Sequence, residues 1–479
     1  MPKTREILSP VLLPPGEGGL KGRMRDFPDS KIPHPAFGHP LPGGAGPSEN
    51  TLSRYLSLLL LLLLCTSSIY AAGFQTTVTV ALEELNKGNV FEAIHKLKLT
   101  LPENPQAYFY LSGIYARMGR YDTAYRYLSS ALQDNPAQAA YYDQLGLIRQ
   151  YEGCRPEALA AFRHALTLGM KTEEATVWRH IGDVYVDLLE WDKAIDAFRN
   201  TLRLRPNDAA AHLALGRVYL NRNDTTTALV ELRAALEVTP AVAGLYATLG
   251  RAYRAAGDPE SAITILTKGI ERDSSDQESR YILAQTLLAD GRLKEGGRVL
   301  DDFQQLQERI TLTNTLFEDA VERAEAGDLA DAERLLRETL NLALRYAPAL
   351  QTLGTVLLSR GSAQPALEVF RQSLVVNPLN SETYLNMGAA YLRLGDLNNA
   401  LEMTQKALVI EDEDARHFTQ LAEIYSKISR PDQSRAALDK AAELRARPRY
   451  RQRDRYRSEA RRRDDAATVR QICDGAPSP

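Results

Sequence analysis

The chain has 479 residues, of which 25% are charged and 44% are hydrophobic, as is typical of a soluble folded protein. Its formal net charge of −3 predicts no global attraction to nucleic acid. The three cysteines, Cys65, Cys154 and Cys473, have no metal-type spacing and exclude a disulfide-rich scaffold.

The N-terminal part of the sequence falls into two sections. Residues 1–50 are rich in proline and glycine, which predicts a disordered segment or a mis-assigned start. Residues 51–73 contain a leucine-rich run, 56–65, with an arginine before it and small residues after it, the pattern of a secretory signal peptide. Because residues 55–74 could also span a bilayer, an uncleaved anchor is the alternative. We expect an exported or membrane-anchored protein, periplasmic or in the cell envelope, and a cytoplasmic protein if this run is not a signal.

The centre of the chain repeats with a period of 34 residues. The recurring residues are Gly182, Gly216 and Gly250, then Tyr185, Tyr219 and Tyr253, then Ala194, Ala228 and Ala262. Glycine inside a helix costs about 0.5–1 kcal/mol relative to alanine. Three glycines in one phase therefore indicate that another backbone approaches closely there.

Each period has room for two amphipathic helices. In one period the two apolar faces consist of Trp178, Ile181, Tyr185 and Leu188, and then of Ala194, Ile195, Phe198 and Leu202. We expect the carboxylate of Asp192 to cap the second helix at its start. Pro206 should end that helix, because proline lacks an N–H and disfavours helical geometry in the residue before it.

This pattern resembles the tetratricopeptide repeat, a helix-turn-helix unit of 34 residues. The family places an aromatic residue, a glycine, a tyrosine, an alanine and a phenylalanine where this chain has Trp178, Gly182, Tyr185, Ala194 and Phe198. The corresponding residues of two later units are Gly354 and Ala366, then Gly388, Tyr391 and Ala400.

The resemblance covers about eleven units. We divide them into an array at 74–310, units one to seven, and an array at 311–448, units eight to eleven. The first unit is slightly short, and two residues are added to the period near Glu173 and again near Thr311. The resemblance implies an all-α fold, a right-handed superhelical solenoid of helix-turn-helix hairpins with a concave groove.

The family's groove positions give candidate binding residues in the central units. They correspond to Arg179, Asp183, Arg217, Leu220, Ala247, Arg251 and Arg254. Guanidinium groups suit carboxylates, so an acidic or C-terminal peptide is the expected ligand. The alternative is that Arg179 and Arg217 pair with Asp183 and nearby acids. Asp183 departs from the family's lysine and asparagine clamp, which argues against recognition of chaperone tails.

The sequence contains no metalloprotease, serine-hydrolase or phosphate-loop motif, and its seven histidines are scattered. We therefore expect no catalytic residue, no metal, no cofactor and no small-molecule substrate. The predicted function is a non-enzymatic scaffold that binds a partner polypeptide in its groove, in the bacterial cell envelope. The partner, the pathway and the oligomeric state are left open.

The C-terminal section, 449–479, is expected to be a disordered tail. Ten arginines lie between Arg445 and Arg463. A solvated extension is one interpretation of them. The other is contact with anionic lipid, a polyanion or nucleic acid. The alternative function is accordingly a helical-repeat protein that binds RNA or a polyanion through this tail.

Overall fold

The computed structural model describes residues 77–169 and 173–446. The apolar run at 56–65 and the predicted tail at 449–479 lie outside them. The chain divides into two compact units, Met1–Asn104 and Pro105–Pro479. No helix in the described part of the chain combines the length and the apolar character needed to cross a membrane.

In the first unit, residues 77–86 are helical and are followed by α2 (Val90–Leu99). Val78, Ala81 and Leu85 of the earlier helix are buried, as are Ile94 and Leu97 of α2. Both helices thus have the apolar face that the sequence predicts for a repeat unit.

The described residues of the second unit form helices and turns without a strand. The helices are α3 (Pro105–Arg117), α4 (Tyr121–Asp134), α5 (Ala139–Tyr151), α6 (Arg155–Leu168), α7 (Glu174–Asp187), α8 (Trp191–Leu204), α9 (Ala209–Asn221), α10 (Thr225–Val238), α11 (Leu245–Ala255), α12 (Pro259–Arg272), α13 (Gln277–Ala289), α14 (Leu293–Glu325), α15 (Leu329–Leu342), α16 (Ala347–Ser359), α17 (Ala363–Val376), α18 (Ser381–Arg393), α19 (Leu397–Ile410), α20 (Ala415–Lys427) and α21 (Pro431–Ala446).

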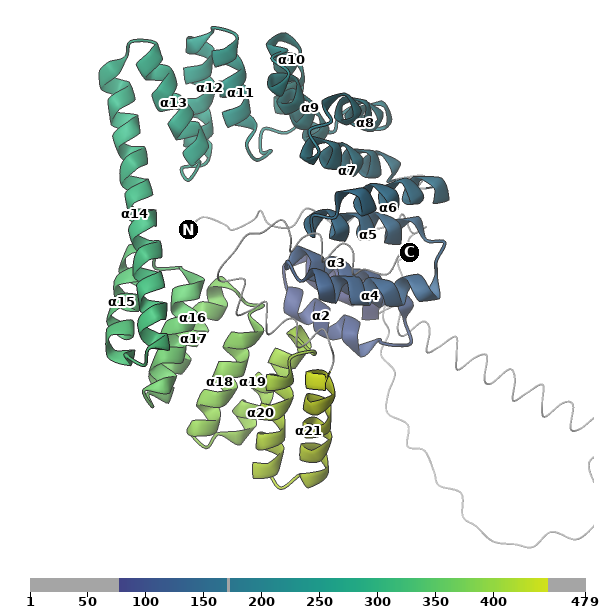
Figure 1. Ribbon diagram of the computed structural model, residues 1–479, viewed down its shortest axis with the longest axis vertical. Coiled ribbons are helices and arrows are strands. Elements are labelled where there is room, and N and C mark those ends of the chain that lie inside the picture. Colours follow the sequence, from purple (N-terminus) through teal and green to yellow (C-terminus); the bar gives the residue numbers. More distant parts are fainter. Residues whose placement is uncertain (1–76, 170–172, 447–479) are drawn as a thin grey trace, which may run out of the picture. The chain divides into compact units, whose positions relative to one another are not determined.

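Consecutive helices pack in pairs to form hairpins, and each hairpin contacts the next (Figure 1). The all-α hairpin fold predicted from the sequence is therefore confirmed. One helix belongs to two hairpins: α14 packs against α13 through its first part and against α15 through its last part (Figure 1). Our division between residues 310 and 311 falls inside this 33-residue helix.

The turn within each hairpin has one residue in the left-handed conformation, and these residues keep the repeat phase. They are Gly119, Gly153, Leu189, Asn223, Gly257, Gly291, Gly327, Gly361, Gly395 and Ser429. Successive members are 34 residues apart, except that 153 to 189 and 291 to 327 are 36 apart. These two steps contain the additions that the sequence placed near Glu173 and Thr311. From Gly88 to Gly119 the step is 31, in keeping with a short first unit.

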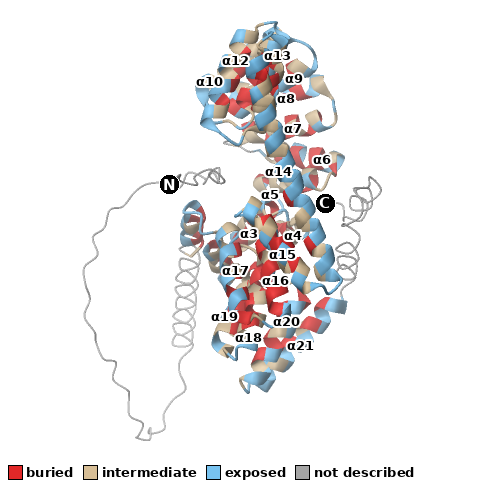
Figure 2. Ribbon diagram, turned by 90° about the vertical axis from the view of Figure 1, so that its left-hand side faces the viewer, coloured by how far each residue is buried: buried red, intermediate tan, exposed pale blue. Residues whose placement is uncertain are grey.

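Glycines of the first helix of a hairpin lie against a large side chain of the second. A Cβ atom on Gly182 would lie 2.5 Å from Phe198 Cε1, and one on Gly250 would lie 2.4 Å from Leu266 Cδ2. Phe198 and Leu266 are fully buried. Figure 2 shows the buried residues on the helix faces that meet one another and the exposed residues on the outer faces. Small residues thus allow the two helices to pack closely.

A hydrogen bond that the sequence analysis missed recurs between neighbouring hairpins. A second-helix arginine donates to the tyrosine hydroxyl of the next first helix. The pairs are Arg163 with Tyr185 at 2.6 Å, Arg199 with Tyr219 at 3.0 Å, Arg233 with Tyr253 at 3.1 Å, and Arg371 with Tyr391 at 3.4 Å. The repeated tyrosine is therefore a polar link as well as an apolar filler.

The predicted role of Asp192 is wrong. The N-cap of α8 is Glu190, and Asp192 lies inside the first helical turn, where its carboxylate pairs with Arg222. The helix begins earlier than expected because Trp191 is already helical. The predicted end is confirmed, since α8 stops at Leu204, just before the Arg205–Pro206 pair.

Candidate functional site

The first helices of four successive hairpins, α7, α9, α11 and α13, contact one another in order. The hairpin period therefore brings their exposed polar residues onto adjoining elements. We call these residues, Arg179, Asp183, Arg217, Arg251 and Glu278, the first-helix surface.

At the α7 end of the first-helix surface, Arg179 Nη1 lies 3.3 Å from Asp183 Oδ2. Neighbouring His180 is buried, and its Nδ1 lies 2.8 Å from Asp143 Oδ1 of α5. Partial burial raises the pKa of Asp183, against the opposing attraction of Arg179. For Arg179, the structure thus favours the alternative in which the arginine is paired within the protein.

Arg217 of α9 has a different environment. Its side chain is exposed, and its Nε donates to Thr248 Oγ1 at 3.4 Å. Among the described residues, no carboxylate lies within ion-pair distance of Arg217. Partial burial of the guanidinium and repulsion by Arg251 lower the pKa of Arg217, while Glu278 and Asp183 oppose this shift. Arg217 is therefore a cation that can accept an external carboxylate.

Gly244 makes room for Arg217 at the start of α11. This glycine is the N-cap of α11 and has a left-handed backbone with φ of 73°. A Cβ atom there would lie 2.5 Å from Arg217 Nη2. The absence of a side chain at this position therefore gives the guanidinium its place beside α11.

Arg251 and Arg254 of α11 both reach toward α13. Arg251 Nη2 lies 3.3 Å from Glu278 Oε1, and Arg254 Nη1 donates to Gln285 Oε1 at 2.9 Å. Arg251 and Glu278 are both about half exposed, so their pair is open to exchange with another charged group.

Two other predicted groove residues belong to the packing. Ala247 is fully buried, and Leu220 packs against the cores around α9. Sequence reasoning also missed Glu278 and Gln285. They occupy, in the next unit, the repeat positions of Gly244 and Arg251, so carrying the family's groove positions one unit further would have found them.

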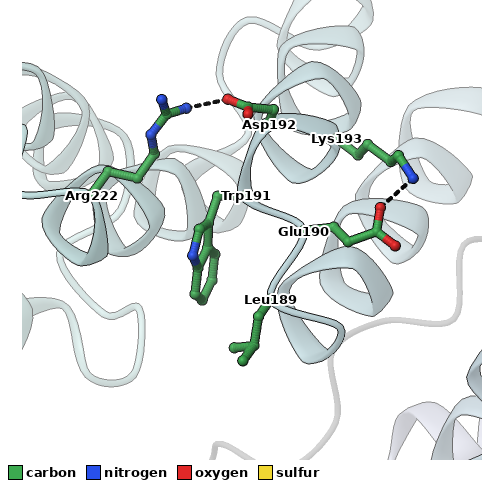
Figure 3. Close-up of a pocket in the computed structure, with 6 residues that line it drawn as sticks. All are labelled: Leu189, Glu190, Trp191, Asp192, Lys193 and Arg222. Carbon is green, nitrogen blue, oxygen red and sulfur yellow. Dashed lines mark hydrogen bonds and ion pairs between the residues drawn. The ribbon is translucent and has the colours of Figure 1, made fainter.

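A separate pocket lies at the turn between α7 and α8 (Figure 3). Its volume is about 400 Å³, and its lining residues are Leu189, Glu190, Trp191, Asp192, Lys193 and Arg222. Asp192 pairs with Arg222, and Glu190 pairs with Lys193, as Figure 3 shows. The charged groups at this pocket are thus paired with one another.

One cluster has the residue types of a metal site. One ligand atom each from Glu411, Asp414 and His417 lies within 4.8 Å of the others, and all three residues are buried. However, Asp414 is bonded to Arg416 at 2.7 Å, and Glu411 is bonded to Arg120 at 3.0 Å. His417 Nδ1 lies 2.8 Å from the backbone oxygen of Glu411. These contacts fit a network that holds the α19–α20 turn.

Comparison with protein families identifies the repeat. The model described as "Tetratricopeptide repeat" matches residues 179–243, 248–306 and 381–413. With hairpins in a 34-residue phase, these matches define an all-α helical-repeat protein. The chain is a tetratricopeptide-repeat protein. No curated protein sequence matches it.

Several solved structures are similar to this chain. Pseudomonas aeruginosa PilF is 16% identical, with a TM-score of 0.41, and covers 45% of this chain and 99% of its own. PilW, titled a "widely conserved type IV pilus biogenesis factor", is 16% identical, with a TM-score of 0.41, and covers 44% of this chain and 98% of its own. YrrB, titled "a TPR protein with an unusual peptide-binding site", is 22% identical, with a TM-score of 0.31, and covers 40% of this chain and 97% of its own.

Proposed function

We propose that this protein is a non-enzymatic scaffold that binds an acidic segment of a partner polypeptide on the first-helix surface. The observation that carries the proposal is Arg217, an exposed guanidinium without a carboxylate partner among the described residues, beside Arg251 on the next first helix. A guanidinium can bind a carboxylate through two parallel hydrogen bonds, which gives direction as well as attraction.

The partly satisfied charges around Arg217 support the same ligand chemistry. Arg251 has one exposed ion pair, with Glu278, and such pairs contribute at most about 1 kcal/mol. A partner carboxylate could therefore bridge Arg217 and Arg251 at little cost to the fold. It would also relieve the mutual repulsion that lowers the pKa of Arg217.

The partner can be captured with a photo-crosslinking amino acid placed at Tyr281. This residue lies on α13, which contributes to the first-helix surface, and it is exposed. We expect a specific protein to be captured in cells of the source organism. Capture should be lost in the Arg217→Glu/Arg251→Glu variant and kept in Arg272→Glu, a charge reversal at an exposed site on α12. Capture that survives the double reversal would overturn the proposal.

We further propose export or anchoring in the bacterial cell envelope, on the sequence pattern of residues 51–73 alone. Fractionation of the source cells, with mass spectrometry of the mature N-terminus, tests this proposal. A protein found only in the cytoplasm with residues 51–73 intact would contradict it. Contact of the arginine-rich tail with anionic lipid or a polyanion is likewise a proposal from the sequence, and strong salt dependence of such binding would test it.

A further inference from the structure

Two segments that are far apart in the sequence contact each other within the second unit. The first is the α3–α4 surface, which we define by Tyr115, Arg120, Arg126 and Tyr127. The second is the acidic turn, Ile410–Asp414, which follows the end of α19 and contains four consecutive acidic residues. Tyr115 and Ile410, which are hydrogen bonded, are 295 residues apart.

Two tyrosines of the α3–α4 surface donate hydrogen bonds to the acidic turn. The Tyr115 hydroxyl donates to the Ile410 backbone oxygen at 2.9 Å, and the Tyr127 hydroxyl donates to Asp412 Oδ2 at 3.1 Å. The two rings are stacked with their centroids 5.4 Å apart. Tyr115 is fully buried, so its hydroxyl needs a protein acceptor, and the turn supplies one.

Two arginines of the same surface neutralise the turn. Arg120 Nη2 lies 3.0 Å from Glu411 Oε2, Arg126 Nη2 lies 3.1 Å from Asp412 Oδ1, and Arg126 Nε lies 3.3 Å from Glu413 Oε1. The Glu411 side chain is 7% exposed. A buried carboxylate among like charges is costly without a cation, and Arg120 provides that cation.

This pairing is not a property of the repeat. The positions that correspond to Arg126 in α8 and α10 hold Asp196 and Val230. The turns that correspond to the acidic turn read Arg-Pro-Asn-Asp at 205–208 and Thr-Pro-Ala-Val at 239–242. Both sides of the contact thus depart from the other units in complementary ways, cationic on one side and anionic on the other.

We propose that the α3–α4 surface is a binding site for acidic peptide segments, and that the chain's own acidic turn occupies it. The turn acts as an internal ligand: its carboxylates take the guanidinium groups, and its Ile410 carbonyl takes the tyrosine hydroxyl. A second acidic segment must compete with it. This site is distinct from the first-helix surface, because it uses α3 and α4 and has its occupant within the same chain.

Carbodiimide crosslinking of the full chain tests the contact, because the reagent joins an amine to a carboxylate without a spacer. In the Arg126→Lys variant, we expect a link from position 126 to Asp412 or Glu413 at low salt, and less of it at high salt. The Arg126→Gln variant has no amine and should give no such link. Mixing unlabelled with isotope-labelled protein shows whether the link is within one chain. The absence of the link, or a link only between two chains, would overturn the proposal.

A competition experiment on the same Arg126→Lys protein tests the ligand chemistry. A synthetic peptide that copies residues 408–416 should lower the crosslink yield in proportion to its occupancy of the site. A matched peptide, with amides in place of the four acidic side chains, should leave the yield unchanged. An acidic peptide without effect at saturating concentration, or equal effects of both peptides, would overturn the assignment of this surface to acidic segments.

Discussion

Gly216 of α9 and Leu232 of α10 are in contact where the two helices of their hairpin cross. A Cβ atom on Gly216 would lie 2.4 Å from Leu232 Cγ, and Leu232 is fully buried. The 34-residue glycine phase thus has a direct physical cause, because a second-helix side chain occupies the space that a Cβ would need.

Substitution of Gly216 should therefore destabilise the array. We expect Gly216→Leu to lower the free energy of unfolding by about 1–3 kcal/mol or more, because the buried Leu232 cannot move without disturbing its neighbours. Gly113→Ala in α3 is the matched control, since its Cβ would meet its nearest neighbour, Gln144 Oε1, at an ordinary 3.7 Å. Chemical denaturation of both variants tests the prediction. An unchanged transition in Gly216→Leu would show that the crossing is misplaced.

Leu189 should be improved by glycine. It has φ of 59°, occupies the turn position that is usually glycine, and is 67% exposed. Leu189→Gly should remove backbone strain with little loss of burial and raise the free energy of unfolding by about 1 kcal/mol.

Leu344→Gly is the control for this change, because Leu344 is 78% exposed and is not among the residues with positive φ. Glycine there should stabilise nothing and should lower stability through chain entropy. Thermal melting of the two variants distinguishes the cases. Equal shifts in the same direction would contradict the assignment of strain to Leu189.

Stability should fall as the pH is lowered through the histidine range. Burial lowers the pKa of His417, outweighing the attraction of Asp414. The unfolded chain, with a histidine pKa of about 6.5, therefore takes up a proton before the folded protein does, and each step below that pH favours unfolding. Urea denaturation between neutral and mildly acidic pH measures the slope.

His417→Gln should flatten this dependence, whereas His164→Gln, at an exposed site, should keep it. A second loss belongs to a lower pH range. Although burial opposes ionisation, the hydrogen bonds and charge of Arg416 lower the pKa of Asp414. Its contribution is therefore present above the unfolded aspartate value of about 3.9 and is lost as the pH falls below it. Stability that rises as the pH falls from neutral would contradict both assignments.

The periodic features were predictable from the sequence because every unit solves the same packing problem. Gly182, Phe198 and their counterparts need only a helix and its neighbour to be understood. Leu189, Asn223 and Ser429 hid the turn phase, since these residues rarely adopt a positive φ. The joined helix α14 was also missed, because the expected two helices per unit placed a break where residues 298–325 contain no glycine or proline.

The site was less predictable than the fold. The family positions brought Asp183, Arg217 and Arg251 together, but the pairing of Arg251 with Glu278 depends on side-chain conformations in two neighbouring units. The contact of Tyr115 with Ile410 was out of reach, because a repeat pattern specifies only how each hairpin packs against the next.

The central claim, that Arg217 and Arg251 bind an acidic partner segment, is tested most directly by affinity. The partner captured from Tyr281 should bind the Arg217→Glu/Arg251→Glu variant at least about tenfold more weakly than the unmodified protein. Arg272→Glu should leave the dissociation constant unchanged. A double variant that is folded and binds the partner as tightly as the unmodified protein would contradict the account.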